Sequence, residues 1–260
     1  MPSTTTPTVV FRRRSRARST ANVAVLSVLL FVAGCEWVAT PTYDGSSRPN
    51  FVFRYLTRDG ADGYTSSAVK GTVQLSGPPT NTGTNTRMVL FPSAQPSSID
   101  QQACATWSTQ TDLRTQQGLA LRIRADQPEG RWRAVTVLKN VLWGANWNFN
   151  VLTWDTRNPS GWTTHGTVDL NRVFWPNQQL APFPWRVCAR VTGDVVTVKG
   201  WRAGTPEPPW NDPNHTGSVR LPPEWSYPGQ AGWYVGHLPS GQQTTFTDLT
   251  LHQLTLESTP

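Results

Sequence analysis

Apolar and polar residues alternate with a period of two through most of the chain after residue 50. In residues 118–125, for example, Leu119, Leu121 and Ile123 alternate with alanine or arginine. Strands show this period because successive side chains point to opposite faces of a sheet. No stretch of eleven or more residues shows the i, i+3, i+4, i+7 spacing of an amphipathic helix. The pattern therefore predicts an all-β protein.

The predicted strands are short and are separated by segments rich in Gly, Pro, Asn or Asp. Two connections, 157–184 and 205–228, are long and rich in proline. At least nine antiparallel strands without a repeat of 40–50 residues favour a sandwich or jelly roll over a propeller. The predicted strands are 68–76, 87–92, 103–108, 118–125, 131–139, 146–155, 184–192, 194–201, 232–238 and 244–256.

The N-terminal segment differs from the rest. Five arginines between residues 12 and 18 precede an apolar run, Ala21–Ala33, that ends in Val32-Ala33-Gly34-Cys35. An apolar run this short does not span a hydrocarbon core of about 30 Å, and it is typical of a signal peptide. The sequence V-A-G-C resembles the lipobox of bacterial lipoproteins. That resemblance implies removal of residues 1–34, attachment of lipid to Cys35, and export to the outer face of the cytoplasmic membrane or cell surface. The choice between Sec and twin-arginine export stays open.

The net charge changes once this leader is set aside. The chain has 23 basic and 16 acidic residues, a net charge of +7, and five of the arginines lie in the leader. The remainder has 18 basic residues against the same 16 acidic ones, so its charge is +2. With no block of Lys and Arg left, nucleic acid is not an expected partner. Residues 35–50, rich in Ser, Thr, Pro and Gly, predict a flexible tether, and residues 51–260 the folded domain.

Two cysteines remain besides Cys35. In an exported chain, Cys104 and Cys188 are most simply one disulfide, closing a loop of about 84 residues and contributing up to ~4 kcal/mol. Both lie on the side of their strands away from the valines. A disulfide requires the two strands to be neighbours or to curl together, with Cα atoms roughly 5–6 Å apart. The spacing of the cysteines and histidines predicts no metal site.

The C-terminal half carries a second resemblance. Residues 187–214 read VCARVTGDVVTVKGWRAGTPEPPWNDPN, and residues 232–254 read GWYVGHLPSGQQTTFTDLTLHQL. The spacing of glycine, valine, tryptophan and acidic residues in these two segments resembles the concanavalin-like lectin and glucanase superfamily, including laminin-G-like modules. The resemblance extends over about residues 105–256. The resemblance implies a concanavalin-like jelly-roll β-sandwich. The matching residues are Gly193, Val196, Lys199, Trp201, Glu207, Pro208, Trp210, Gly232, Gly236, Phe246 and Asp248.

The strand alternation also indicates a candidate binding surface. If Trp147, Phe149 and Val151 face the core, the asparagines of strand 146–155 lie on the opposite face. Asn amides and Arg side chains donate to sugar hydroxyls, and a Trp ring stacks on the apolar face of a pyranose. The pattern predicts binding of an envelope or extracellular carbohydrate. The candidate residues are Asn146, Asn148, Asn150, Trp154, Arg122, Arg124, Lys199 and Trp201.

Other functions stay open. Glucanases of this superfamily carry an E-x-D-x-E strand, which is absent here, and no catalytic residue is assigned. A glycoside hydrolase or polysaccharide lyase could still use loop acids with His215. A protein-binding or structural surface module is a further alternative. Laminin-G-like domains often bind calcium, but no loop dense in Asp and Asn supports it, and no cofactor is predicted. The loop acids are Glu207, Asp212 and Glu224.

Overall fold

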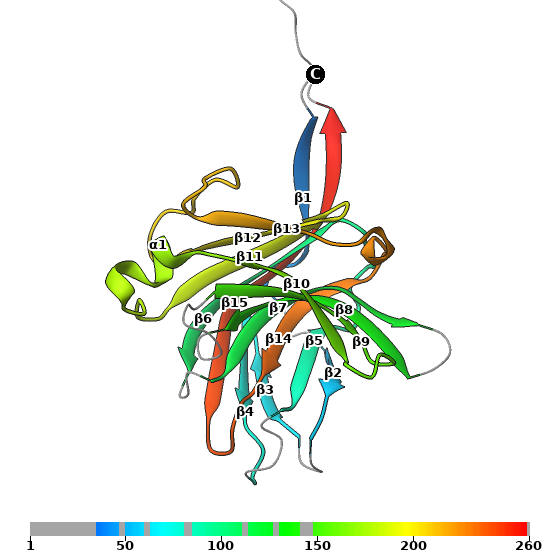
Figure 1. Ribbon diagram of the computed structural model, residues 1–260, viewed down its shortest axis with the longest axis vertical. Coiled ribbons are helices and arrows are strands. Elements are labelled where there is room, and N and C mark those ends of the chain that lie inside the picture. The colour runs from blue at the N-terminus through cyan, green and yellow to red at the C-terminus, as the bar shows by residue number, and fades with distance from the viewer. Residues whose placement is uncertain are drawn as a thin grey trace, which may run out of the picture.

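The computed structural model describes residues 35–46, 50–59, 63–80, 85–110, 114–126, 130–140 and 148–258. Two antiparallel sheets pack face to face in this part of the chain, so it is an all-β sandwich, as predicted (Figure 1). The predicted signal peptide, residues 1–34, lies outside the described residues. In the described ranges, no helix has the length and apolar character needed to cross a membrane.

One sheet, called sheet A here, has β15 near its centre. Strand β1 (Cys35–Tyr43) pairs with β15 outside the main strand order. The order across sheet A is β13 (Thr216–Arg220), β12 (Val195–Arg202), β11 (Trp185–Thr192), β6 (Gln101–Gln110), β15 (Gln243–Ser258), β4 (Thr72–Ser76) and β3 (Thr65–Val69).

The facing sheet, sheet B, contains the remaining strands. Its order is β10 (Trp162–Val168), β9 (Asn148–Asp155), β8 (Arg131–Asn140), β7 (Gln116–Asp126), β14 (Gln230–Gly236), β5 (Arg87–Pro92) and β2 (Phe51–Thr57). Helical structure in the described residues is limited to α1 (Asn171–Phe174) and the 3-10 turns Pro176–Gln178 and Pro223–Trp225.

The core lies between the two sheets and is rich in aromatic rings. Trp107, Trp185 and Trp233 are fully buried there. Burying a ring of this size contributes on the order of 3 kcal/mol. The indole Nε1 of Trp233 donates to the carbonyl of Cys104 at 3.0 Å, so its polar end is also satisfied.

The predicted disulfide is confirmed. Cys104 on β6 and Cys188 on β11 are directly opposite in the register, with Cα atoms 4.1 Å apart. Both side chains lie on the outer face of sheet A, because the alternating residues Ala103, Ala105 and Val187 enter the core. The bond therefore joins two neighbouring strands of one sheet.

The N-terminal end of the predicted tether has a different structure. Cys35–Tyr43 is strand β1, paired along its whole length with the last half of β15. The two strands extend beyond the sandwich as a two-stranded ribbon (Figure 1). Backbone hydrogen bonds hold this ribbon while most of its side chains are exposed. The segment therefore carries no apolar alternation that could predict a strand.

Several predicted strand boundaries also need correction. Residues 68–76, predicted as one strand, fold into the hairpin of β3 and β4, whose turn contains Gly71 at φ 69°. Glycine adopts this left-handed conformation without the steric cost that a side chain adds. The pattern also missed β2, β10 and β13. Two of these, β10 and β13, lie within the proline-rich connections that were expected to be loops.

Candidate functional site

The outer face of sheet B carries the candidate residues of β9. Phe149 and Val151 enter the core, as predicted. The alternate residues Asn148, Asn150 and Trp154 therefore lie on the outer face. The remaining candidate of this strand pattern, Asn146, lies outside the described residues.

A pocket of about 320 Å³ opens on this face, and its lining comes from six strands of the sheet together with Asn85 and His237, which lie just outside β5 and β14. We call it the Trp162 pocket. Its volume is at the lower end of the range for small-molecule sites, about 300–1,000 Å³. The lining residues are Asn85, Arg87, Gln116, Leu138, Asn140, Asn150, Leu152, Trp154, Trp162, Thr164, Tyr234 and His237. Two of the sequence-predicted residues, Asn150 and Trp154, are among them.

Two tryptophans form the aromatic wall of the pocket. Trp154 on β9 and Trp162 on β10 are directly opposite in the register, with ring centroids 5.5 Å apart. Trp154 is 1% exposed, and its indole Nε1 donates to Thr136 Oγ1 at 2.8 Å. Trp162 is 39% exposed. Trp162 is therefore the ring of this pair that a ligand reaches.

Side-chain amides stand beside this wall. Asn150 on β9 is half-buried, and Asn140 lies on the neighbouring strand β8, opposite Asn148 in the register. The Oδ1 atoms of Asn140 and Asn148 are enclosed without a hydrogen-bond partner among the described residues. A buried acceptor without a donor costs about 1–3 kcal/mol. Of these two residues, Asn140 lines the pocket and Asn148 does not, so the pocket holds one such acceptor for water or a ligand hydroxyl.

Arg87 is held in place against the two tryptophan rings. Its Nη1 donates to Thr57 Oγ1 and to the carbonyl of Asn85, both at 3.1 Å. Its Nη2 lies 2.9 Å from His237 Nε2. The guanidinium also lies over the Trp162 ring, 4.8 Å from the centroid. These contacts fix a cation and a ring in one orientation, so little entropy is lost when a ligand binds.

Tyr234 closes the floor. Its hydroxyl donates to Gln116 Oε1 at 3.2 Å. Complete burial raises the pKa of Tyr234 above its ordinary value of 10.0, so the phenol keeps its proton at neutral pH. The pocket is therefore lined here by a neutral phenol, that of Tyr234, and by the cationic guanidinium of Arg87.

Arg122 was predicted on this surface, and the structure shows that this is wrong. A β-bulge interrupts β7 between Leu121 and Arg124, and Arg122 adopts φ 51°. The bulge shifts the alternation by one residue and turns the side chain inward, where it is fully buried. Arg124, the other candidate of this strand, lies 4.6 Å from the ring of Tyr227 and does not line the Trp162 pocket.

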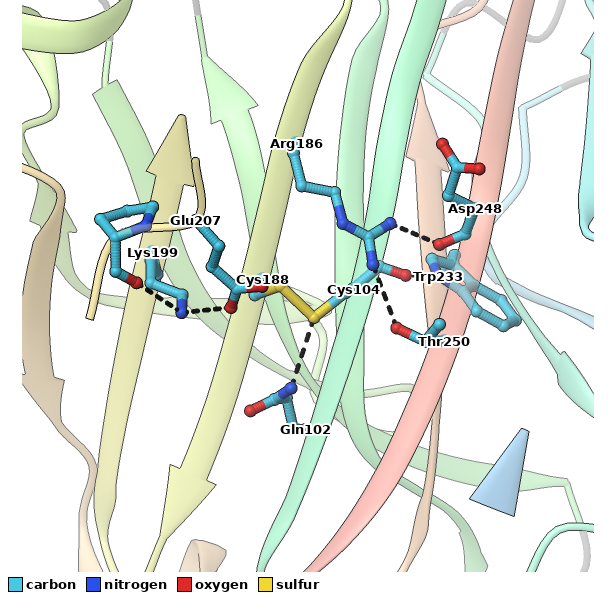
Figure 2. The surroundings of a disulfide bond; sticks show 10 residues. Gln102, Cys104, Arg186, Cys188, Lys199, Glu207, Trp233, Asp248 and Thr250 are labelled. Carbon is cyan, nitrogen blue, oxygen red and sulfur yellow. Dashed lines mark hydrogen bonds and ion pairs between the residues drawn. A yellow bond between two sulfur atoms is a disulfide. The ribbon is translucent and has the colours of Figure 1, made fainter. Parts of the chain in front are cut away.

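Lys199 and Trp201 lie on the other side of the molecule. Trp201 packs on the Cys104–Cys188 disulfide at the outer face of sheet A. Lys199 is 1% exposed, and its Nζ lies 2.5 Å from Glu207 Oε1 (Figure 2). The candidate residues therefore do not form one surface, because β12 and β9 belong to different sheets.

Sequence reasoning missed Trp162, Arg87, Asn140 and His237. Asn140 could have been found, because it continues the alternation of Thr136 and Leu138 by one step past the predicted strand. Trp162 lies on β10, an edge strand with mostly exposed side chains, where no apolar alternation marks the strand.

The loop acids proposed for catalysis are dispersed. Glu207 is paired with Lys199, and Asp212 Oδ1 accepts the backbone N–H of Asn214 at 2.9 Å. His215 Nδ1 lies 2.9 Å from the carbonyl of Gly200. Within the described parts of the chain, no group of three or more His, Cys, Asp or Glu is placed to hold a metal ion.

The comparisons with known proteins concern the fold. No protein-family model matches the chain. No curated protein matches it by sequence. The solved CBM2 module of the evolved Dit of Lactobacillus casei BL23 phage J-1 superposes with a TM-score of 0.50 at 12% identity, covering 85% of this chain and 99% of that one.

A Bacillus subtilis protein of unknown function with a galectin-like fold superposes with a TM-score of 0.51 at 11% identity, covering 84% of this chain and 99% of that one. At these identities the similarity shows the fold alone. This chain has a lectin-type jelly-roll β-sandwich, in agreement with the predicted class.

Proposed function

We propose that this protein binds an envelope or extracellular carbohydrate in the Trp162 pocket without catalysis. The observation that carries the proposal is the exposed Trp162 ring beside the amides of Asn140 and Asn150 in one pocket. An indole face packs on the apolar face of a pyranose, and the amides donate to and accept from its hydroxyls. The shared fold places the two sheets but identifies no ligand, so these side chains support the proposal.

The chemistry of the lining favours binding over hydrolysis. Glycoside hydrolysis by the usual route needs two carboxyl groups about 5–10 Å apart on either side of the scissile bond. Among the described residues, those that line the Trp162 pocket include Asn, Gln, Arg, His, Thr and aromatic side chains, but no Asp or Glu. This set offers hydrogen bonds and a ring face, which suit recognition.

A glycan array tests the proposal. We expect binding of the protein to a defined subset of glycans and at least tenfold weaker binding of Trp162→Ala, because removal of a central aromatic contact typically costs 2 kcal/mol or more. Asn150→Ala should weaken binding less. Thr163→Ala, exposed on the same strand but outside the pocket lining, is the matched control. Absence of glycan binding, or equal binding by Trp162→Ala, would contradict the proposal.

We also propose that the protein is an exported lipoprotein anchored through Cys35. The support is the V-A-G-C sequence and the position of Cys35, an exposed, free cysteine at the end of the β1–β15 ribbon. At ~3.3 Å per residue, the nine residues of β1 extend about 26 Å. In place of a flexible tether, a paired ribbon would then hold the sandwich away from the lipid surface.

Membrane fractionation tests the anchor. Cys35→Ser should move the protein out of the membrane fraction, since serine provides no thiol for lipid attachment. The double variant Cys104→Ser/Cys188→Ser should remain in the membrane fraction, because it keeps Cys35. Equal membrane association of wild type and Cys35→Ser would refute the anchor without touching the carbohydrate proposal.

A further inference from the structure

A second pocket lies on the outer face of sheet A, on the opposite side of the sandwich from the Trp162 pocket. It has a volume of about 450 Å³ and is formed by β1, β6, β11 and β15 with the loop between β12 and β13. We call it the Arg190 pocket. The Cys104–Cys188 disulfide is part of its lining. None of its lining residues belongs to the Trp162 pocket, so a role for it goes beyond the proposed function.

Cations outnumber carboxylates around this pocket. Arg186 and Arg190 flank Cys188 on β11, and Lys199 lies on the neighbouring strand. The carboxylate among the lining residues, that of Glu207, is already paired with Lys199. Figure 2 shows this pair beside the disulfide. Glu207 therefore forms its ion pair with Lys199 and not with Arg186 or Arg190.

Arg186 is satisfied by neutral acceptors. It extends from β11 across β6 to β15, where it donates to the carbonyl of Asp248 and to Thr250 Oγ1 (Figure 2). Burial lowers the pKa of Arg186, and the nearby carboxylates of Asp248 and Glu207 partly offset this decrease. These contacts hold the guanidinium in position but do not neutralise its charge.

Arg190 has no such partners. Its guanidinium lies 4.4 Å from the ring centroid of Trp210, and within the described chain it forms no hydrogen bond or ion pair; its Nε is enclosed without an acceptor. Burial lowers the pKa of Arg190, and no neighbouring charge opposes that effect. His252 Nδ1, also in this pocket, is enclosed and unpartnered as well. Partly buried cations without a counter-charge are costly, and a bound anion removes that cost.

We propose that the Arg190 pocket binds an oxyanion, the phosphate or carboxylate group of a soluble or glycan-linked molecule. Arg190 donates to the anion while Trp210 holds the plane of its guanidinium. A planar guanidinium recognises carboxylate and phosphate by two parallel hydrogen bonds. His252 and Gln102 supply further polar contacts at the same pocket.

An anionic lipid surface fits the pocket less well. Glu36 and Glu257 are exposed and directly opposite each other on the ribbon that leads away from the pocket. The side chain of Glu207 is 60% exposed at the pocket itself. These carboxylates repel a negatively charged membrane but leave a discrete anionic group free to enter. A soluble oxyanion is therefore the occupant that the charges favour.

NMR titration of the full protein tests this proposal. Inorganic phosphate and glucuronate are the probes, and glucose is the neutral control. We expect saturable shifts of the Arg190 Nε–H resonance with at least one anionic probe and none with glucose. Arg190→Gln should weaken that affinity ten- to hundredfold, since it removes a charged donor. Lys70→Gln, which removes an exposed charge at the β3–β4 turn, should bind as wild type does.

Two results would overturn the proposal. One is no saturable response to either anion, or an equal response from Arg190→Gln once its melting temperature shows that it is folded. The other is binding to phosphatidylglycerol vesicles over phosphatidylcholine vesicles that Arg190→Gln abolishes, with no response to the soluble probes. The second result would assign the pocket to a lipid headgroup. Neither result depends on Trp162, so both are separable from failure of the carbohydrate proposal.

Discussion

The buried position of the Arg122 side chain can be tested by measuring how much it contributes to stability. Its side chain is fully buried, with Nε donating to the carbonyl of Ile99 at 2.9 Å and Nη1 to that of Trp225 at 2.6 Å. Nη2 donates to the carbonyl of Gly193, and Asp100 lies 4.0 Å away. The guanidinium therefore joins three loop segments at one end of the sandwich.

Replacement by methionine, of similar length, removes all three hydrogen bonds. Each carbonyl left without a donor costs about 1–3 kcal/mol, while the cost of burying the charge disappears. We expect Arg122→Met to lower the free energy of unfolding by about 3–5 kcal/mol. For a domain of this size, the melting temperature should fall on the order of 6 to 20 °C. Urea unfolding and calorimetry measure the two quantities.

Arg124→Met is the matched control. Arg124 is partly exposed and lies 4.6 Å from the ring centroid of Tyr227, a contact of an exposed cation with a ring, so we expect a loss of no more than about 1 kcal/mol. A structural role for Arg122 is excluded if Arg122→Met unfolds at the same urea concentration as wild type. If that variant keeps its stability but loses glycan binding, Arg122 acts at the ligand instead.

Three further predictions concern stability. Replacing both Cys104 and Cys188 by alanine should lower the free energy of unfolding by about 4 kcal/mol, because the bond closes a loop with a sequence separation of 84 residues. A double variant with the same free energy of unfolding in urea as wild type would exclude this. Gly232→Ala should lower the melting temperature by several degrees, since the new Cβ meets the carbonyl oxygen of Leu90 at 2.2 Å; an unchanged calorimetric transition contradicts it. Burial lowers the pKa of His252 below 6.5, so the unfolded chain binds its proton more readily. Stability should be fully present above about pH 6.5 and fall on acidification, and His252→Asn should flatten this dependence in urea titrations.

The sequence predicted the parts of the fold in which burial follows strand alternation. Strands with one face in the core, such as β5, β8 and β11, were found because their side chains alternate between core and outer face. Strands β1 and β10 were missed because both faces of these strands are largely exposed. Their strand structure depends on backbone pairing with β15 and β9, which leaves little pattern in composition.

The candidate site was predicted in part for the same reason. Asn150 and Trp154 were placed correctly because β9 keeps its register without interruption. Arg122 was misplaced because a single extra residue in β7 reverses the alternation, and no residue type marks this bulge. Lys199 and Trp201 were assigned to the same face because alternation gives the face of a strand but not the sheet to which it belongs.

The proposed function requires that carbohydrate binds in the Trp162 pocket. The most direct measurement is an NMR titration of the ¹⁵N-labelled protein with a glycan selected on the array. Binding in this pocket should produce saturable shifts of the Trp162 indole N–H and of the side-chain amides of Asn140 and Asn150. Shifts confined to the Arg190 pocket, or to residues remote from Trp162, would contradict it.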